Sequence, residues 1–278
     1  MATHALHVGI NNYKGTDNDL FGCVMDASDI KRVVGPRRGA ANDALDRCQF
    51  FGNADTQVVL LDAKATRARV LAALDLLLKR LERGDLGIFT FSGHGTYVRD
   101  KSGDEEDGYD EALVCADLDV ILDDELGTML ERRAAGSRLL IQTDACHSGT
   151  ATRSLGPRLL GPTNRTYRKR FLPPAAIPRR NIEGWRTARL KRTSKLVDVI
   201  HFGACRDREF ASDTEFGGRP NGAFTYYWLQ CLMGLEPGAT YRDWSDALID
   251  VLPSEDFDQE PQTNAYQKAF DWKIPVRK

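Results

Sequence analysis

Short apolar runs alternate along the chain with longer segments in which apolar residues recur at helical spacing. The runs at 5–10, 57–61, 86–91, 138–142 and 196–203 have the length and composition of buried strands. The segments at 23–34, 66–83, 124–133, 224–235 and 241–252 have the periodicity of helices with one buried face. This alternation predicts an α/β fold in which helices flank both faces of a mainly parallel central sheet.

Length and composition are those of a globular protein with a sizeable core. The chain has 278 residues, 42% of them hydrophobic, and a formal net charge of −2. We therefore expect one domain over 1–278, a monomer, and no nucleic-acid or membrane partner. The six cysteines form no CxxC pair, and no secretory or membrane-spanning pattern is visible, so we predict free thiols and a cytoplasmic protein.

The small net charge hides a strong segregation of charge. Residues 104–125 include eleven Asp and Glu and no Lys or Arg. Residues 153–195 include thirteen Lys and Arg, one acid and five prolines. We predict that 153–195 is a long, exposed basic loop, because Pro and unbalanced charge disfavour regular elements.

Two predicted strands lead directly into polar motifs that contain a histidine and a cysteine. The run 86–91 continues into Ser92-Gly93-His94-Gly95, and the run 138–142 continues into Thr143-Asp144-Ala145-Cys146. Carboxyl ends of parallel strands meet at one sheet edge, where ligand sites form. A thiol peptidase needs a cysteine, a base and oxyanion donors, which Cys146, His94 and the N–H groups of Gly95 and Cys146 could supply. From spacing alone, a buried structural Cys and a structural His are the more common explanation of such residues.

The two motifs together resemble those of the caspase-like peptidases, and more narrowly the metacaspase branch. The residues that carry the resemblance are Phe91-Ser92-Gly93-His94-Gly95 and Asp144-Ala145-Cys146-His147-Ser148-Gly149. Weaker matches follow along nearly the whole chain, at 8–13, 20–27, 107–111, 122–125, 203–207, 222–226 and 259–262. The resemblance implies a caspase-like sandwich, a cysteine endopeptidase activity and a His94–Cys146 dyad, with His147 pointing away from the site.

The resemblance also implies cleavage of protein or peptide substrates after Arg or Lys. Asp26 and Asp144 match the acidic positions of the first specificity pocket, and Cys23 matches a cysteine close to it. Asp144 lies two residues before Cys146, so in an extended segment the two side chains point the same way. Two carboxylates could pair with one guanidinium.

Calcium is the one cofactor that the resemblance suggests. Asp110, Asp123 and Asp124 match three of the family's ligand positions, and clustered carboxylates suit a hard cation. The fourth position is expected near 151–153, where Ala-Thr-Arg replaces an acid. The sequence therefore leaves calcium binding open, and the acidic stretch could instead be solvated or hold the basic loop.

A peptidase specific for Arg or Lys should be able to cut its own basic loop. The candidate residues before the cut are Arg153, Arg165, Arg170, Arg180, Arg189 and Lys191. A nucleic-acid patch or a charged linker are alternative explanations of this loop. Two alternative functions also remain for the chain, a catalytically silent interaction module and a caspase-like enzyme that cuts after Asp.

Overall fold

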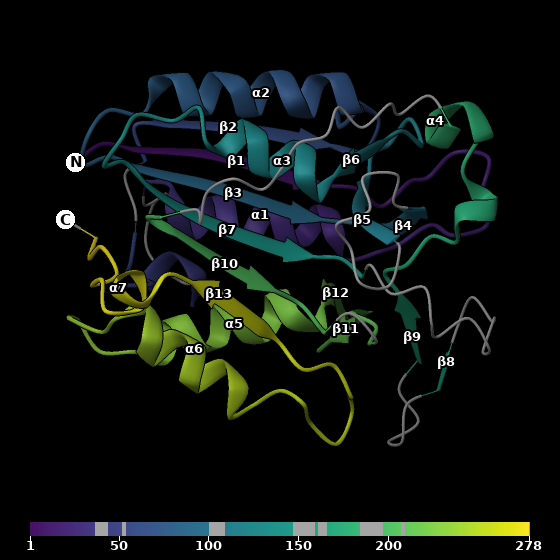
Figure 1. The fold of residues 1–278 in the computed structure, drawn as a ribbon. Helices are drawn as coiled ribbons and strands as arrows, with labels where there is room; N and C mark the ends of the chain where they lie inside the picture. The colour runs from purple at the N-terminus through teal and green to yellow at the C-terminus, as the bar shows by residue number, and fades with distance from the viewer. Residues whose placement is uncertain are drawn as a thin grey trace.

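The computed structural model describes residues 1–36, 44–51, 54–99, 109–146, 159–160, 166–183, 197–206 and 209–277. A six-stranded sheet in the order β13-β10-β7-β3-β1-β2 crosses the molecule (Figure 1). All its strand pairs are parallel except the edge pair of β10 and β13. Its strands are β1 Thr3–Gly9, β2 Thr56–Leu61, β3 Leu86–Ser92, β7 Arg138–Asp144, β10 Val199–Gly203 and β13 Gln262–Ala265.

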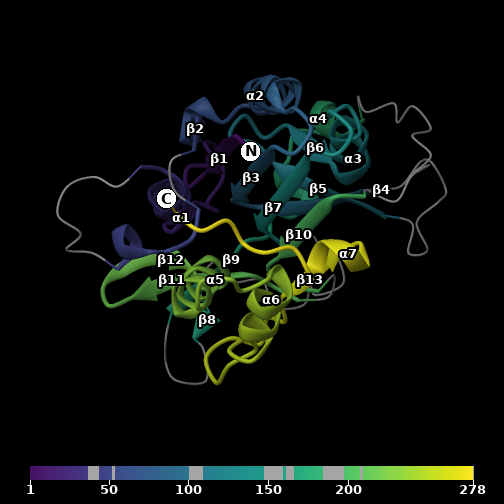
Figure 2. The same cartoon turned by 90° about the vertical axis from the view of Figure 1, so that its left-hand side faces the viewer.

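Helices cover both faces of this sheet, which confirms the predicted caspase-like α/β sandwich (Figures 1 and 2). Helices α2 (Arg67–Arg80) and α3 (Asp123–Leu130) pack on one face, and α1 (Cys23–Val34), α5 (Ala223–Gly234) and α6 (Tyr241–Ile249) pack on the other. Successive residues of β3 serve opposite cores, since Phe89 packs with α2 and Ile88 packs with α1 and α5. No helix of the described residues is long and apolar enough to cross a bilayer.

Two small sheets lie beside the carboxyl ends of the central strands. One contains β4 (Gly95–Arg99), β5 (Tyr109–Val114) and β6 (Val120–Leu122). The other contains β8 (Leu159–Leu160), β9 (Thr166–Lys169), β11 (Ser212–Phe216) and β12 (Arg219–Gly222). Three further short elements are η1 (Leu45–Arg47), η2 (Asp62–Lys64) and α7 (Gln267–Phe270).

The basic segment 153–195 departs from its prediction where it is described. It contributes β8, β9, η3 (Pro174–Ala176) and α4 (Arg179–Glu183) rather than loop alone. Arg170 and Leu172 are fully buried and Ile177 is nearly so, so the prediction of an exposed loop is wrong for these residues. Arg170 is buried because three carboxylates surround its guanidinium.

Candidate active site

The two polar motifs lie side by side at the carboxyl ends of β3 and β7. These strands pair in parallel with Ser92 opposite Asp144, and the Gly93 N–H donates to the Asp144 carbonyl at 3.2 Å. His94 therefore follows β3 at the same sheet edge at which Cys146 follows β7. Neighbouring parallel strands explain how residues 52 positions apart reach one site.

His94 is held in one orientation by two groups of the segment that follows β1. Its Nε2–H donates to the Asn18 carbonyl at 2.5 Å, while its backbone N–H donates to the Tyr13 hydroxyl at 2.7 Å. The Tyr13 ring also packs against the imidazole, with ring centroids 4.6 Å apart. A proton on Nε2 leaves Nδ1 as the basic nitrogen, and Nδ1 finds no hydrogen-bond partner among the described groups.

Burial controls the charge of this imidazole. It lowers the pKa of His94 to about 4, although the nearby Asn18 and Arg170 carbonyls favour the protonated ring. The ring is therefore neutral at pH 7, as a general base must be before it accepts a proton.

One carbonyl oxygen lies between the two motifs. The Arg170 carbonyl accepts hydrogen bonds from the Gly95 N–H at 3.0 Å and from the Cys146 N–H at 3.1 Å. Two convergent backbone donors of this kind can stabilise negative charge on a carbonyl oxygen. Gly95 and Cys146 are thus brought together in the arrangement that an oxyanion hole requires.

The Arg170 side chain fills a closed pocket beside this carbonyl. Its guanidinium contacts Asp26 at 2.7 Å, Asp213 at 2.9 Å and Asp144 at 3.1 Å, and it donates to the Ser92 hydroxyl at 2.5 Å. The arginine and the three acids are each at most 2% exposed. A buried guanidinium that meets several carboxylates is a strongly paired cation.

Backbone and hydroxyl donors hold the pocket acids in place. Asp144 accepts from the N–H and hydroxyl of Thr225, and Asp26 accepts from the Asn221 amide and the Gly222 N–H. The net effect of these surroundings raises the pKa of Asp144 to about 6, because burial and the nearby Asp26 raise it more than Arg170 and the Thr225 donors lower it.

Gly222 forms a wall of the pocket because a side chain would not fit there. A β-carbon at this position would lie 2.3 Å from Asp144 Oδ2 and 2.6 Å from Arg170 Cζ. The absent side chain is therefore part of the pocket's shape.

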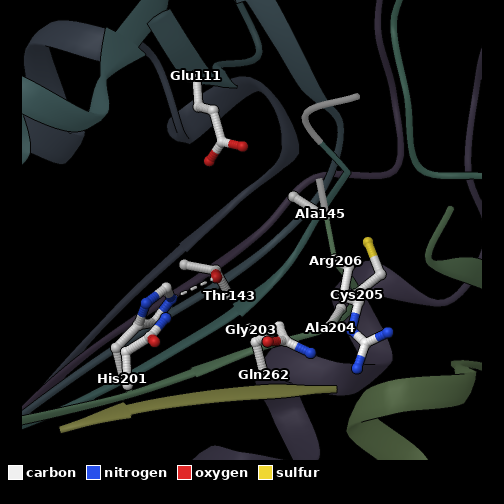
Figure 3. A pocket seen from close by; sticks show the side chains of 10 residues that line it. Glu111, Thr143, Ala145, His201, Gly203, Ala204, Cys205, Arg206 and Gln262 are labelled. Carbon is white, nitrogen blue, oxygen red and sulfur yellow. Dashed lines mark hydrogen bonds between the residues drawn. The ribbon is translucent and has the colours of Figure 1, made fainter. Parts of the chain in front are cut away.

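Two further thiols lie near the nucleophile candidate. Cys23 is fully buried beside Ser92, and burial raises its pKa well above the usual value. The Cys146 thiol itself is fully buried and accepts a hydrogen bond from the Ala211 N–H at 2.5 Å. Cys205 follows β10, and its thiol donates to the Glu209 carbonyl at 3.6 Å. Cys205 also lines a polar cavity of about 320 Å³ with Ala145 and Thr143, at the ends of β7, β10 and β13 (Figure 3).

The chain around Arg170 crosses the site as an extended strand. Lys169 lies opposite Ser212 in the antiparallel pair of β9 and β11, and the Arg170 N–H donates to the Ala211 carbonyl at 3.0 Å. Beyond Arg170, the Leu172 N–H donates to the Gly95 carbonyl at 2.9 Å. The segment is bonded on both sides of the Arg170 carbonyl, as a peptide bound by strand addition would be.

The three acids proposed as calcium ligands lie on two elements. Asp110 lies on β5, and Asp123 and Asp124 begin α3. Within the described ranges, no three His, Cys, Asp or Glu side chains form a group that could hold a metal ion. Positions 151–153, where a fourth ligand was expected, lie outside the described residues, so calcium stays a prediction from the family resemblance.

Some of the predicted site residues lie outside the described part of the chain, and some residues that shape the site were not predicted. His147 and four candidate cleavage residues, Arg153, Arg165, Arg189 and Lys191, lie outside the described residues, and Arg180 is exposed on α4. Sequence reasoning missed five residues that shape the site: Tyr13, Asn18, Ser92, Asp213 and Gly222. Tyr13, Ser92 and Gly222 stood inside quoted motifs, which was a usable signal, whereas Asn18 acts only through its backbone carbonyl.

Comparison with known families assigns this chain to one of them. The family model described as metacaspase, peptidase C14 domain, matches residues 3–154, more than half of the chain. The chain belongs to the metacaspase family of caspase-like cysteine peptidases.

Curated relatives support this assignment over most of the chain. Metacaspase-1 of Cryptococcus neoformans is 29% identical over 94% of this chain, and Metacaspase-1 of Mycosarcoma maydis is 28% identical over the same share. The match covers 62% of the length of the Cryptococcus protein and 69% of that of the Mycosarcoma protein.

Two solved structures have a similar fold. Protein GSU0716 of Geobacter sulfurreducens superposes with a TM-score of 0.69 over the full length of both chains, at 27% identity. Caspase-1 of Spodoptera frugiperda superposes with a TM-score of 0.55 over 99% of this chain and 88% of its own, at 10% identity. The second likeness establishes the caspase-like fold alone.

Proposed function

We propose that this metacaspase is an endopeptidase that cuts proteins after Arg or Lys, with Cys146 as nucleophile and His94 as acid and base. One observation carries the proposal. Arg170 places its guanidinium among three carboxylates and its carbonyl oxygen between the Gly95 and Cys146 N–H groups. This is the position that the residue before a scissile bond must take.

The proposed chemistry is acyl transfer through a thioester. His94 Nδ1 accepts the Cys146 proton, and the thiolate attacks the substrate carbonyl carbon while the two N–H groups stabilise the oxyanion. The protonated imidazole then donates its proton to the leaving amine, and water hydrolyses the thioester. The Asn18 carbonyl holds the ring proton on Nε2, which leaves Nδ1 as the nitrogen that can take up the thiol proton.

Charge in the pocket favours a cationic substrate over an acidic one. An Asp side chain would meet three buried carboxylates without a counter-ion, which like-charge repulsion and desolvation both oppose. A Lys ammonium could enter the same pocket, although it lacks the planar fork that lets Arg170 contact several acids at once. We therefore expect Arg to be preferred to Lys, and both strongly to Asp.

We further propose that the Arg170–Phe171 bond is an autoprocessing site. Among the candidates in the basic segment, Arg170 is the one that occupies the pocket in the described structure, and Arg180 faces solvent. While Arg170 remains there, it excludes other substrates, so cutting or lifting this segment should open the site.

The test incubates the wild-type chain and Cys146→Ala, and then determines the new N-termini by mass spectrometry. We expect a fragment that begins at Phe171 from the wild type and none from Cys146→Ala. Arg170→Gln should not be cut at this bond. Because removing one partner of a buried ion pair costs about 3–5 kcal/mol, this variant could also lose stability. Arg170→Lys is therefore tested beside it, since it keeps the charge and should still be cut.

Fluorogenic peptides that end in Arg, Lys or Asp distinguish the remaining functions. Turnover of the Arg peptide that is equal in wild type and Cys146→Ala would overturn the peptidase proposal and favour a silent interaction module. Preference for the Asp peptide would favour the Asp-directed alternative. Repeating the Arg assay with added calcium or a chelator tests the calcium prediction separately.

A further inference from the structure

The side chains around the Arg170–Phe171 bond fall on two sides of the extended segment. Lys169 and Phe171 are two residues apart and both contact the Phe210 ring. Arg170 and Leu172 are fully buried, with the guanidinium in the carboxylate pocket. This alternation is that of a regular strand, so each side chain flanking the bond meets its own set of protein groups.

Phe210 contacts the residues on both sides of the bond. The Lys169 ammonium lies over its ring, 3.7 Å from the centroid, and the Phe171 ring lies 6.0 Å away at an angle of 60°. A cation over a ring face and a tilted aromatic pair are both attractive geometries.

A second ring completes the environment of Phe171. Tyr97 on β4 stacks on Phe171 with centroids 5.9 Å apart and planes 10° apart. Tyr109 on β5 supports Tyr97 edge-on at 5.0 Å. Phe171 is only 9% exposed, so Tyr97 and Phe210 form an aromatic slot for the residue after the bond.

The residue two positions before Arg170 meets a third ring. The Arg168 guanidinium lies over Phe21, 4.1 Å from the ring centroid, and also donates to the Asp19 carbonyl. Phe21 is 44% exposed, so a cation of a bound substrate could reach its ring.

We propose that these rings form subsites that select substrates of the sequence basic-basic-Arg followed by an aromatic residue. The proposal rests on the proposed function and defines its substrate class. Phe210 selects a cation at the position before the pocket residue and an aromatic ring at the position after the cut. Tyr97 contacts the same aromatic ring. Phe21 selects a cation two positions before the pocket residue. The segment Arg168-Lys169-Arg170-Phe171-Leu172 is then an internal copy of the preferred substrate.

Quenched peptides test this on the self-cleaved wild-type enzyme. The parent peptide carries Arg-Lys-Arg-Phe-Leu. Three analogues replace its Lys by norleucine, its Phe by glycine, or its first Arg by citrulline, so that each removes one charge or one ring. Cation–π contacts at partly exposed sites are worth about 0.5–2 kcal/mol, so we expect kcat/KM to fall about twofold to thirtyfold for the norleucine and citrulline analogues. The glycine analogue loses the ring contacts of the Phe and should also fall.

A matched pair of variants assigns the effect to the ring. In Phe210→Leu, the ratios of parent to norleucine peptide and of parent to glycine peptide should fall towards one. Phe270→Leu is the control. Phe270 lies on α7 and makes the same kind of contact, with Arg242 over its ring at 5.0 Å. The substrate ratios of this variant should match those of the wild type. The ratio of kcat/KM values for two peptides on the same enzyme does not depend on how much of the enzyme is folded, because the active fraction divides out. The comparison therefore remains valid if a variant folds poorly.

The outcomes separate this inference from the proposed function. Cleavage after Arg at equal rates in all four peptides would overturn the subsites and leave the Arg-directed peptidase intact. Equal ratios in Phe210→Leu and wild type would show that the ring holds only the chain's own segment, which also overturns the inference. No Cys146-dependent cleavage of any Arg peptide would overturn the proposed function itself.

Discussion

Three carboxylates share one guanidinium in the Arg170 pocket, so the buried site holds more negative than positive charge. Asp144 shows the consequence, because burial and the neighbouring Asp26 raise its pKa to about 6 even with Arg170 present. When the pocket is empty, the lowering effect of Arg170 is lost and the pKa should be higher still.

This shift predicts how the enzyme depends on pH. A carboxyl whose pKa is raised to about 6 is neutral below that pH and charged above it, so the pocket should bind a cation better as the pH rises. We expect kcat/KM for an Arg peptide to rise through pH 6–7. His94, whose pKa is lowered to about 4, is already neutral over this range and should not produce the rise.

The Asp144→Asn variant tests which group is responsible. Its overall kcat/KM should be lower, but it should lose the rise between pH 6 and 7, as measured with an Arg peptide from pH 5 to 8. A rise that persists unchanged in Asp144→Asn would contradict the assignment to Asp144.

Gly222 gives a prediction that depends on shape rather than charge. A methyl group at this position would lie 2.3 Å from Asp144 Oδ2, so Gly222→Ala must push the carboxylate or the bound guanidinium aside. Overpacking costs about 1–3 kcal/mol, and we expect kcat/KM for Arg peptides to fall about tenfold or more. Gly234→Ala, which would meet nothing within 4 Å, is the control and should keep normal kinetics.

At the scale of elements, the close packing of α1 on β1 positions Asp26 in the pocket. A β-carbon on Gly9 of β1 would lie 2.4 Å from the Cys23 carbonyl and 2.9 Å from the Ala27 β-carbon. Backbone atoms cannot move aside as a flexible side chain can, so α1 would have to shift as a whole.

The Gly9→Ala variant should therefore lower both stability and substrate affinity. We expect the free energy of unfolding to fall by about 1–3 kcal/mol and KM for Arg peptides to rise, measured by denaturant unfolding and steady-state kinetics. Gly127→Ala on α3 is the matched control, since its methyl would meet open space. Removing a glycine from a helix should stabilise it by about 0.5–1 kcal/mol, and loss of stability there would contradict this account.

Periodicity in the sequence predicted the elements that form the two main cores. The predicted helix at 23–34 matches α1, and the predicted strand at 86–91 matches β3 within one residue, because both bury apolar residues at regular spacing. The strands β9 (Thr-Tyr-Arg-Lys) and β12 (Arg-Pro-Asn-Gly) were missed, since their residues resemble a loop. Cross-strand bonds and buried charge contacts stabilise these strands, and a local pattern cannot show either.

The same difference explains which site residues were found. His94, Cys146, Asp26 and Asp144 stand in short motifs at element ends, where residue type alone suggests chemistry. Asp213 lies on β11, which was not predicted as a strand, and it reaches the pocket only because β12 leads back to α1. In sequence, Arg170 is one of many basic residues in 153–195, and only its three carboxylate contacts in the fold distinguish it.

At the scale of the molecule, the chain on each side of the Arg170–Phe171 bond contributes to the same sheet and the same pocket. The part before the bond supplies β1, β2, β3 and β7, and the part after it supplies β10 and β13. Asp26 and Asp144 come from the first part and Asp213 from the second. Neither part alone could form the pocket.

The C-terminal residues form another connection between the part of the chain after the bond and the part before it. The Phe51 N–H donates to the Pro275 carbonyl at 2.7 Å, and the Arg277 guanidinium donates to the Val33 carbonyl at 2.6 Å. Burial of the β7–β10 seam between the two cores adds apolar contact to these bonds. A cut at Arg170 would therefore leave the fold closed.

Autoprocessing should thus be intramolecular and should produce two fragments that stay together. Because the segment already crosses its own site, the first-order rate should not change when the protein is diluted tenfold, as followed by gel densitometry. The fragments that end at Arg170 and begin at Phe171 should co-elute in size-exclusion chromatography and separate only in denaturant. A rate that falls in proportion to concentration would show that one chain cuts another, and fragments that separate in native buffer would show that the shared sheet does not hold the halves together.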